Sequence, residues 1–261
     1  MLTPYLLRAP APTADGLRLF CFHHAGGSAA AFATWQRGLG PRAEVLPVQL
    51  PGREGRLSEP RATDMTRLVD ELVRELGDLF RPPFAFYGHS MGALLAYAVA
   101  QRLRDRGAAL PTLLAVGAYP APDRPGLMTD VPRMAADDLA ALLVRIGGMS
   151  EMLLDYPEWR DAAIDLVRDD LRVCHSYRHV PDAPLPTPIT AFVGDRDPLM
   201  TPDDATPWAG HTTSGFELQP IPGGHFFLRD SAPVLLGALR RSLAAAGARR
   251  GVAHAAPGER D

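Results

Sequence analysis

The chain has 261 residues, of which 46% are hydrophobic and 22% are charged, and its formal net charge is −3. This composition supports a sizeable hydrophobic core and excludes a wholly disordered chain. The slight negative charge argues against general electrostatic attraction to nucleic acid or to an anionic membrane, so neither is expected as a partner.

The first residues and the cysteines are those of a reduced, soluble protein. The segment "MLTPYLLRAPAP" lacks a basic start followed by a long apolar run, and no segment reaches the roughly 18 apolar residues of a membrane span. The two cysteines, Cys21 and Cys174, form neither a disulfide framework nor a zinc-binding spacing. We therefore expect a cytoplasmic protein, favour a monomer, and expect no cofactor and no bound metal.

Short apolar runs alternate with longer helical patterns along most of the chain. The runs are too apolar for a sheet with one face in water, as expected of a parallel sheet covered on both faces. The alternation predicts an α/β fold with a doubly wound, mostly parallel sheet. The predicted strands are 17–22, 44–50, 84–88, 113–119, 189–194 and 216–221, and the predicted helices among them are 63–80, 91–104 and 231–246.

One segment, 121–184, interrupts this alternation. It has no clear strand, carries helical patterns at 137–154 and 161–178, and lies between proline-rich joints. Four of the eight methionines fall in it, and adaptable methionine side chains suit a lid over varied apolar ligands. We interpret it as a helical lid, the alternative being a small helical subdomain with its own core. The whole chain, 1–261, is predicted to be one domain with this insertion and a disordered tail at about 250–261.

The sequence "FAFYGHSMGALLAYAVA", residues 84–100, places Ser90 between two glycines where a predicted strand meets a predicted helix. Gly-x-Ser-x-Gly in this context is typical of a nucleophile elbow, in which a strained turn exposes the serine and small neighbours leave room for the backbone. The alternative is an ordinary tight turn with a serine that caps the helix.

A serine hydroxyl needs a base to attack at neutral pH, and the base needs an acid to orient it. In this fold the acid and then the histidine follow the serine, on loops after later strands. Of the histidines after Ser90, only His225 stands on a loop between a predicted strand and a predicted helix. Asp195 and Asp197 both follow the strand 189–194, and we favour Asp197 as the acid and Asp195 as a brace of the turn.

Four other histidines are interpreted as structural. His175 and His179 have a spacing that also suits a metal, but no third ligand accompanies them, so we interpret them as solvated surface residues. His23 and His24 precede the serine and would break the usual chain order. We interpret these two as residues that shape their loop.

An oxyanion formed at Ser90 needs backbone donors. The N–H of Met91, at the start of the helix, is one candidate. The second donor is expected on the loop after the first strand, in "FCFHHAGGSAAAF", and we assign it to Ala25 with Gly26 as the alternative.

Together these segments resemble the type II thioesterases, stand-alone α/β-hydrolases that accompany polyketide synthases and nonribosomal peptide synthetases. The similar segments, spread along most of the chain, are "LFCFHHAGGSAAAF", "VQLPGREGRLSEP", "FYGHSMGALLAYAVA", "GDRDPLM" and "PGGHFFL". His23 stands where the family pattern has a proline. The resemblance implies hydrolysis of acyl groups from the phosphopantetheine arm of acyl or peptidyl carrier proteins, by a triad of Ser90, Asp197 and His225. It also implies a role in editing misprimed chains or in releasing products.

Other functions stay open at this point. The same carbonyl chemistry would serve an intracellular carboxylesterase or an acyl transfer to an alcohol or amine, and a broken triad would leave a carrier-binding scaffold. Carrier proteins are usually acidic, so their recognition would have to rest on a local basic patch. We interpret Arg53, Arg56 and Arg61, on the loop after the second predicted strand, as that patch. The alternative is that these arginines simply decorate a surface loop.

Overall fold

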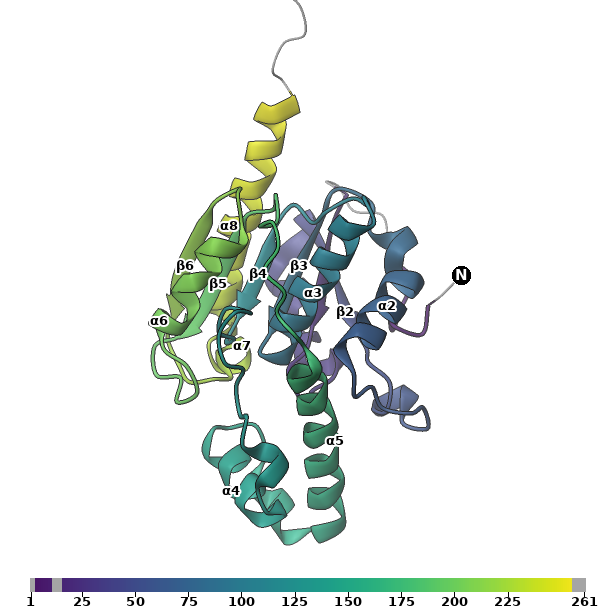
Figure 1. Ribbon diagram of the computed structural model, residues 1–261, viewed down its shortest axis with the longest axis vertical. Coiled ribbons are helices and arrows are strands. Elements are labelled where there is room, and N and C mark those ends of the chain that lie inside the picture. The colour runs from purple at the N-terminus through teal and green to yellow at the C-terminus, as the bar shows by residue number, and fades with distance from the viewer. Residues whose placement is uncertain (1–2, 11–15, 255–261) are drawn as a thin grey trace, which may run out of the picture.

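The computed structural model describes residues 3–10 and 16–254, and a six-stranded sheet forms its centre (Figure 1). All neighbouring strands are parallel, in the order β2-β1-β3-β4-β5-β6. Each strand overlaps one of the predicted strands, so the predicted parallel sheet is confirmed. The strands are β1 (Leu17–Phe22), β2 (Ala43–Val48), β3 (Phe84–His89), β4 (Leu114–Gly117), β5 (Ile189–Gly194) and β6 (Phe216–Ile221).

Helices cover both faces of the sheet (Figure 1). On one face α2 (Met65–Leu76) packs against α3 (Met91–Asp105), and on the other α1 (Trp35–Leu39) packs against α8 (Ala232–His254). Buried residues recur every three or four positions in α2, which turns one apolar stripe toward the core. The shorter helices are η1 (Ala29–Phe32), η2 (Gly40–Arg42), η3 (Glu54–Arg56), η4 (Gly77–Leu79), η5 (Val131–Arg133), η6 (Glu151–Asp155), α6 (Pro202–Ala205), η7 (Thr206–His211) and α7 (Phe227–Asp230).

The last helix is longer than the sequence predicts. Helix α8 continues to His254, so residues 250–254, which were expected to be disordered, are helical. The rest of the expected tail, 255–261, lies outside the described residues.

The order of the strands creates the crevice in which the site lies. Strand β1 has β2 on one side and β3 on the other, so the chain changes direction across the sheet between them. In parallel sheets, ligands bind at the carboxyl ends of the strands next to such a reversal. The loop 23–28 after β1 and the turn at Ser90 after β3 are therefore brought together.

The helical insertion lies between β4 and β5. Its longer helices are α4 (Ala136–Arg145) and α5 (Pro157–Ser176), and the described residues of 121–184 contain no strand. The insertion projects from the body of the molecule, at the end opposite the last turns of α8 (Figure 1). Its apolar side chains form a separate cluster, as the subdomain interpretation requires: Val131, Leu139, Ala140, Leu143, Ile164, Val167 and Leu171.

Candidate active site

Ser90 lies in the tight turn between β3 and α3. Its backbone has φ 54° and ψ −122°, a positive φ that residues other than glycine rarely adopt. Its N–H donates to the carbonyl oxygen of Gly117 at 2.7 Å, which ties the turn to β4. A Cβ on Gly88 would lie 2.0 Å from the carbonyl oxygen of Gly92, and a Cβ on Gly92 would lie 2.1 Å from that of Phe22. Close backbone contacts therefore require both glycines, as expected of a nucleophile elbow.

The three side chains predicted to act together form one hydrogen-bonded chain. The Ser90 hydroxyl donates to Nε2 of His225 at 3.1 Å, and Nδ1–H of His225 donates to Oδ2 of Asp197 at 2.8 Å. The side chains of His225 and Asp197 are 3% and 0% exposed. Ser90 makes no capping hydrogen bond to α3, which disagrees with the alternative of a capping serine. A buried chain of this kind can accept the serine proton on the imidazole and stabilise the imidazolium that forms.

The two aspartates considered for the acid have different partners. Oδ1 of Asp197 accepts the N–H of Leu199 at 2.8 Å, which fixes the carboxylate against His225. Oδ1 of Asp195 accepts the N–H of Gly223 at 2.8 Å, and its side chain is 49% exposed. Asp195 therefore braces the turn after β6, whereas the sequence predicts that it braces its own turn after β5.

His89, for which the sequence predicts no role, also supports His225. Its Nε2–H donates to the carbonyl oxygen of His225 at 2.8 Å, and its Nδ1 accepts from the Tyr87 hydroxyl at 3.0 Å. Burial, followed by the neighbouring imidazoles, lowers the pKa of His89 well below its usual value, so the ring is neutral. Its place inside the Gly-x-Ser-x-Gly motif was the available signal, but only the fold shows what it contacts.

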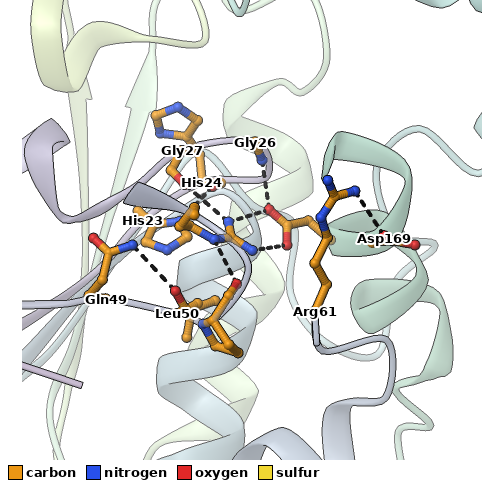
Figure 2. Close-up of polar contacts among 11 residues, drawn as sticks. His23, His24, Gly26, Gly27, Gln49, Leu50, Arg61 and Asp169 are labelled. Carbon is orange, nitrogen blue, oxygen red and sulfur yellow. Dashed lines mark hydrogen bonds and ion pairs between the residues drawn. The ribbon is translucent and has the colours of Figure 1, made fainter. Parts of the chain in front are cut away.

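The loop 23–28, which we call the oxyanion loop, follows β1 (Figure 2). The carbonyl oxygen of His24 accepts the N–H of Gly27 at 3.0 Å and closes a tight turn. Gly26 has φ 73° in this turn, the conformation that a type II turn needs at its third position. The N–H of Gly26 donates to Oδ2 of Asp170 at 2.7 Å. The alternative oxyanion donor, Gly26, is therefore already engaged.

The two favoured donors lie at the same pocket as the serine. Ala25 and Met91 both line the pocket that contains Ser90. In the described part of the chain, neither backbone N–H donates to a protein acceptor. The first turn of a helix has no internal acceptors for its N–H groups, which explains why the Met91 N–H is free.

The two histidines of the oxyanion loop are not bonded to the triad. Nδ1–H of His23 donates to the carbonyl oxygen of His24 at 2.8 Å, and His23 is buried. Burial, with the charge of Arg53, lowers the pKa of His23 to about 3, so its ring is neutral. The His24 ring packs edge-on against Phe226, with 5.0 Å between ring centroids. These contacts agree with the prediction that both residues shape their loop.

The predicted basic patch does not form. Arg53 and Arg56 are only 4% and 7% exposed. Arg53 pairs with Asp170, and Arg61 pairs with Asp169 at 3.2 Å (Figure 2). The prediction is wrong because two of the three guanidinium groups are used inside the protein, where they neutralise or hydrogen-bond buried groups.

An inner pocket lies over Ser90 and is small. Its volume is about 30 Å³, which is room for one or two water molecules. Both ends of the insertion contribute to its apolar roof. The lining residues are His24, Ala25, Ser90, Met91, Tyr119, Leu127, Met128, Leu143, Ile146, Val167, Leu171, Cys174, His225 and Phe226.

A larger outer hollow, of about 650 Å³, lies beside the inner pocket. The walls of both include Tyr119 and Cys174, so these two side chains separate them. The outer hollow carries four basic side chains and one acid: Arg124, His175, Arg178, His179 and Asp123.

The described residues contain no group of three or more His, Cys, Asp or Glu side chains that could hold a metal ion. His175 and His179 line the outer hollow, and the His179 ring packs against that of His211 with 5.4 Å between centroids. None of the helices among these same residues has the length and apolar character needed to cross a membrane.

Known proteins resemble this chain over most of its length. The sequence profile of the Thioesterase domain family matches residues 17–243. Gramicidin S biosynthesis protein GrsT of Aneurinibacillus migulanus is 35% identical over 227 residues, which cover 87% of this chain and 89% of that protein.

Two solved structures resemble this chain in both fold and sequence. RedJ, a thioesterase from the prodiginine biosynthetic pathway in Streptomyces coelicolor, superposes with a TM-score of 0.80 at 37% identity and covers 92% of this chain and 91% of that one. BorB, a type II thioesterase from the borrelidin biosynthetic cluster, superposes with a TM-score of 0.81 at 34% identity and covers 92% of this chain and 98% of that one. The architecture is therefore that of the α/β-hydrolases.

Proposed function

This chain belongs to the thioesterase domain family, and we propose that it hydrolyses acyl groups from the phosphopantetheine arm of acyl or peptidyl carrier proteins. Such hydrolysis edits stalled or misprimed chains, or releases products, in polyketide or nonribosomal peptide biosynthesis. The observation that carries the proposal is the buried chain from Ser90 through His225 to Asp197 beneath an apolar pocket.

The reaction proceeds in two halves. Ser90 Oγ attacks the thioester carbonyl while Nε2 of His225 takes the hydroxyl proton, and Asp197 stabilises the resulting imidazolium. The C–S bond then breaks, the leaving thiolate takes that proton, and the acyl group stays on Ser90 as an ester. Water attacks this ester while His225 takes its proton. The bond to Ser90 Oγ then breaks, His225 returns the proton to that oxygen, and a carboxylic acid is released.

The N–H groups of Ala25 and Met91 stabilise the oxyanion that forms in each half of the reaction. Both line the pocket with Ser90, and both are without an acceptor in the described residues. Donors that are fixed before the reaction stabilise the developing charge without having to reorganise.

The insertion acts as the lid of this site. A volume of about 30 Å³ cannot hold an acyl chain, so part of the roof has to move before substrate binds. The C-terminal half of α5 is anchored, since the Ser176 hydroxyl accepts the N–H of Met65 at 2.7 Å and Asp169 pairs with Arg61. We therefore assign the motion to α4 and the first half of α5.

Hydrogen exchange tests this assignment, because mobile lids belong to the less stable parts of a fold, whose helical hydrogen bonds open locally more often than those of the core. Amides of α4 should exchange faster than those of the C-terminal half of α5, and those of β3 should exchange slowest. Protection of α4 equal to that of β3 would mean that the insertion is a fixed subdomain.

We assign recognition of the carrier protein to the outer hollow, because Arg53 and Arg56 are buried and cannot bind a partner. Arg178 is exposed at its rim and donates to backbone carbonyls, with no acidic partner in the described chain. An unpaired cation at the mouth of a hollow suits a phosphate and an acidic carrier surface. The hollow, of about 650 Å³, has room for the pantetheine arm, whose thioester would reach Ser90 once the Tyr119 and Cys174 side chains between the two cavities move aside.

Charge reversal at this rim separates docking from chemistry. Arg178→Glu should raise KM for an acyl-carrier protein several-fold and leave hydrolysis of a small acyl thioester unchanged. The effect should shrink with salt, since exposed charges are screened over about 10 Å at 0.1 M. Arg37→Glu, at an exposed position on α1, is the matched control. Equal losses for both variants would assign the effect to net charge alone.

The substrate class is tested by intact-mass measurement of deacylation across a panel of acyl-carrier proteins, with the corresponding oxygen esters as comparison. Faster hydrolysis of the carrier-bound thioesters, abolished in Ser90→Ala, is the expected result. Preference for small oxygen esters would make the protein a carboxylesterase, and acyl transfer to an added alcohol or amine without acid release would make it a transferase.

A further inference from the structure

The oxyanion loop is held by a residue of the insertion. Oδ2 of Asp170, in α5, accepts the N–H of Gly26 at 2.7 Å (Figure 2). Asp170 is 1% exposed and Gly26 is half-buried, so this bond is partly shielded from water. The Asp170 carboxylate therefore holds the peptide group between Ala25 and Gly26. Ala25 is the residue whose own N–H we assign to the oxyanion.

The same helix also touches the loop through an apolar contact. A Cβ on Gly26 would lie 2.5 Å from Cγ2 of Val167, which precedes Asp170 by about one turn of α5. The turn of the loop, with its positive φ at Gly26, is therefore pressed against α5 on one side and bonded to it on the other. Any movement of this part of α5 changes the position of the oxyanion loop.

Arg53 offsets the cost of burying the charged Asp170 carboxylate. Its two terminal nitrogens donate to the two oxygens of Asp170 at 2.8 and 2.7 Å, and one of them also donates to the carbonyl oxygen of Gly27 at 3.0 Å. Its Nε–H donates to the carbonyl oxygen of Pro51 at 3.2 Å. An unpaired carboxylate at this point would oppose negative charge on the substrate oxygen. Paired with Arg53, the carboxylate keeps its hydrogen bond to the loop while its charge is cancelled.

We propose that Asp170 is a positioning residue for the oxyanion donor at Ala25, with Arg53 as its counter-charge. This inference rests on the function proposed above and adds that the oxyanion site is complete only while α5 is seated against the loop. The insertion thus closes the pocket and sets the geometry of catalysis through one helix.

The first test is Asp170→Asn, which keeps the shape of the side chain but removes its charge and one acceptor oxygen. We expect kcat for a small acyl thioester to fall about tenfold or more, with KM within about threefold of the wild type, because the loss of a whole oxyanion donor costs about 10²- to 10³-fold. The rate at which a fluorophosphonate labels Ser90 should fall in parallel, since its phosphoryl oxygen uses the same donors. Asp165→Asn, at an exposed position on α5 away from the anchoring contacts, is the matched control and should leave both rates unchanged.

The second test separates positioning from stability. The double variant Arg53→Met/Asp170→Leu removes both charges together, and replacing a buried ion pair with apolar residues is often neutral or stabilising. Its melting temperature should stay close to that of the wild type, while kcat stays at least about tenfold lower because Gly26 has lost its acceptor. Recovery of kcat to within twofold of the wild type would overturn the proposal, as would an Asp170→Asn variant that keeps more than half of its kcat.

Failure of the proposed function can be distinguished from failure of the Asp170 proposal. If wild-type Ser90 is not labelled by the fluorophosphonate, or wild-type protein hydrolyses no thioester, the triad assignment is at fault. The variants at Asp170 are compared with an active, labelled wild type, so their outcome bears on the position of the loop alone.

Discussion

The nucleophile elbow and the oxyanion loop lie side by side at the ends of β3 and β1, yet they are held in different ways. The elbow is fixed by its own backbone, since a side chain on Gly88 or Gly92 would collide with main-chain atoms at 2.0 and 2.1 Å. The oxyanion loop is fixed by the carboxylate of Asp170, 144 residues further along the chain from Gly26. One half of the site is therefore a property of a short sequence, and the other half depends on the seating of the insertion.

This difference has a functional consequence. The nucleophile is in place whatever the insertion does, whereas the oxyanion loop is bonded to the same element that roofs the pocket. In the lid motion proposed above, opening of the roof at α4 would leave Asp170 in place, because the C-terminal half of α5 is bonded to α2 through Met65 and Ser176. The proposed motion would thus admit substrate without releasing the loop to which we assign the oxyanion donor.

The largest expected effect is on the elbow side, at Ser90. Ser90→Ala should fold normally and lose at least about 10³-fold in turnover, because the acyl-enzyme route is removed. His225→Ala should be comparably damaging. Both are measured as deacylation of an acyl-carrier protein, with thermal unfolding to confirm the fold. Retention of more than a tenth of wild-type turnover by Ser90→Ala would refute its assignment as the nucleophile.

The next effect distinguishes the two aspartates beside His225. Asp197→Asn should lower turnover about 10²- to 10⁴-fold, since an amide in place of the carboxylate leaves the imidazole in the wrong tautomer. Asp195→Asn should cost about 1 kcal/mol of stability or less, because it only weakens a half-exposed hydrogen bond to Gly223. If Asp195→Asn proves the more damaging to turnover, the acid is misassigned.

A backbone substitution tests whether the elbow is fixed locally. Gly92→Ala should lower the free energy of unfolding by at least about 3 kcal/mol, because the new methyl group meets the main chain of Phe22, which cannot yield as a side-chain end would. Gly77→Ala is the control, since its Cβ would have nothing within 4 Å and its φ is −54°. The control should be neutral or slightly stabilising in urea unfolding. Similar losses in both variants would contradict the comparison.

The smallest expected effect is the contribution of His23, in the oxyanion loop, to the pH dependence of the free energy of unfolding. The pKa of His23 is lowered from 6.5 to about 3, so between these values the unfolded chain binds a proton that the folded protein does not. Stability therefore falls as the pH decreases through this window, by about 2 kcal/mol from pH 7 to pH 5 for this one group. His89 acts in the same direction, so the difference between His23→Leu and wild type isolates His23. The variant should have the flatter dependence of unfolding free energy on pH, and parallel curves would show that His23 is not held neutral.

The sequence by itself determined the strands, the elbow and the pairing of His225 with an acid after β5. Apolar periodicity, glycine spacing and the order of loops in a parallel sheet are local or topological properties, so a single chain displays them. Asp197 and Asp195 were separable in sequence by their distance from the strand end, and their hydrogen bonds in the structure agree with that distinction.

Only the tertiary structure decided the burial of charge. Arg53 and Arg56 stand in a loop that the sequence marks as exposed, and Asp170 stands in an amphipathic helix with other acids beside it. Arg53 is buried against Asp170, 117 positions away, and Arg56 packs over Tyr5 and donates to the carbonyl oxygen of Gln49. Apolar periodicity in the sequence does not reveal such contacts. The same holds for His89, whose ring supports His225 only because the loop after β6 returns to the end of β3.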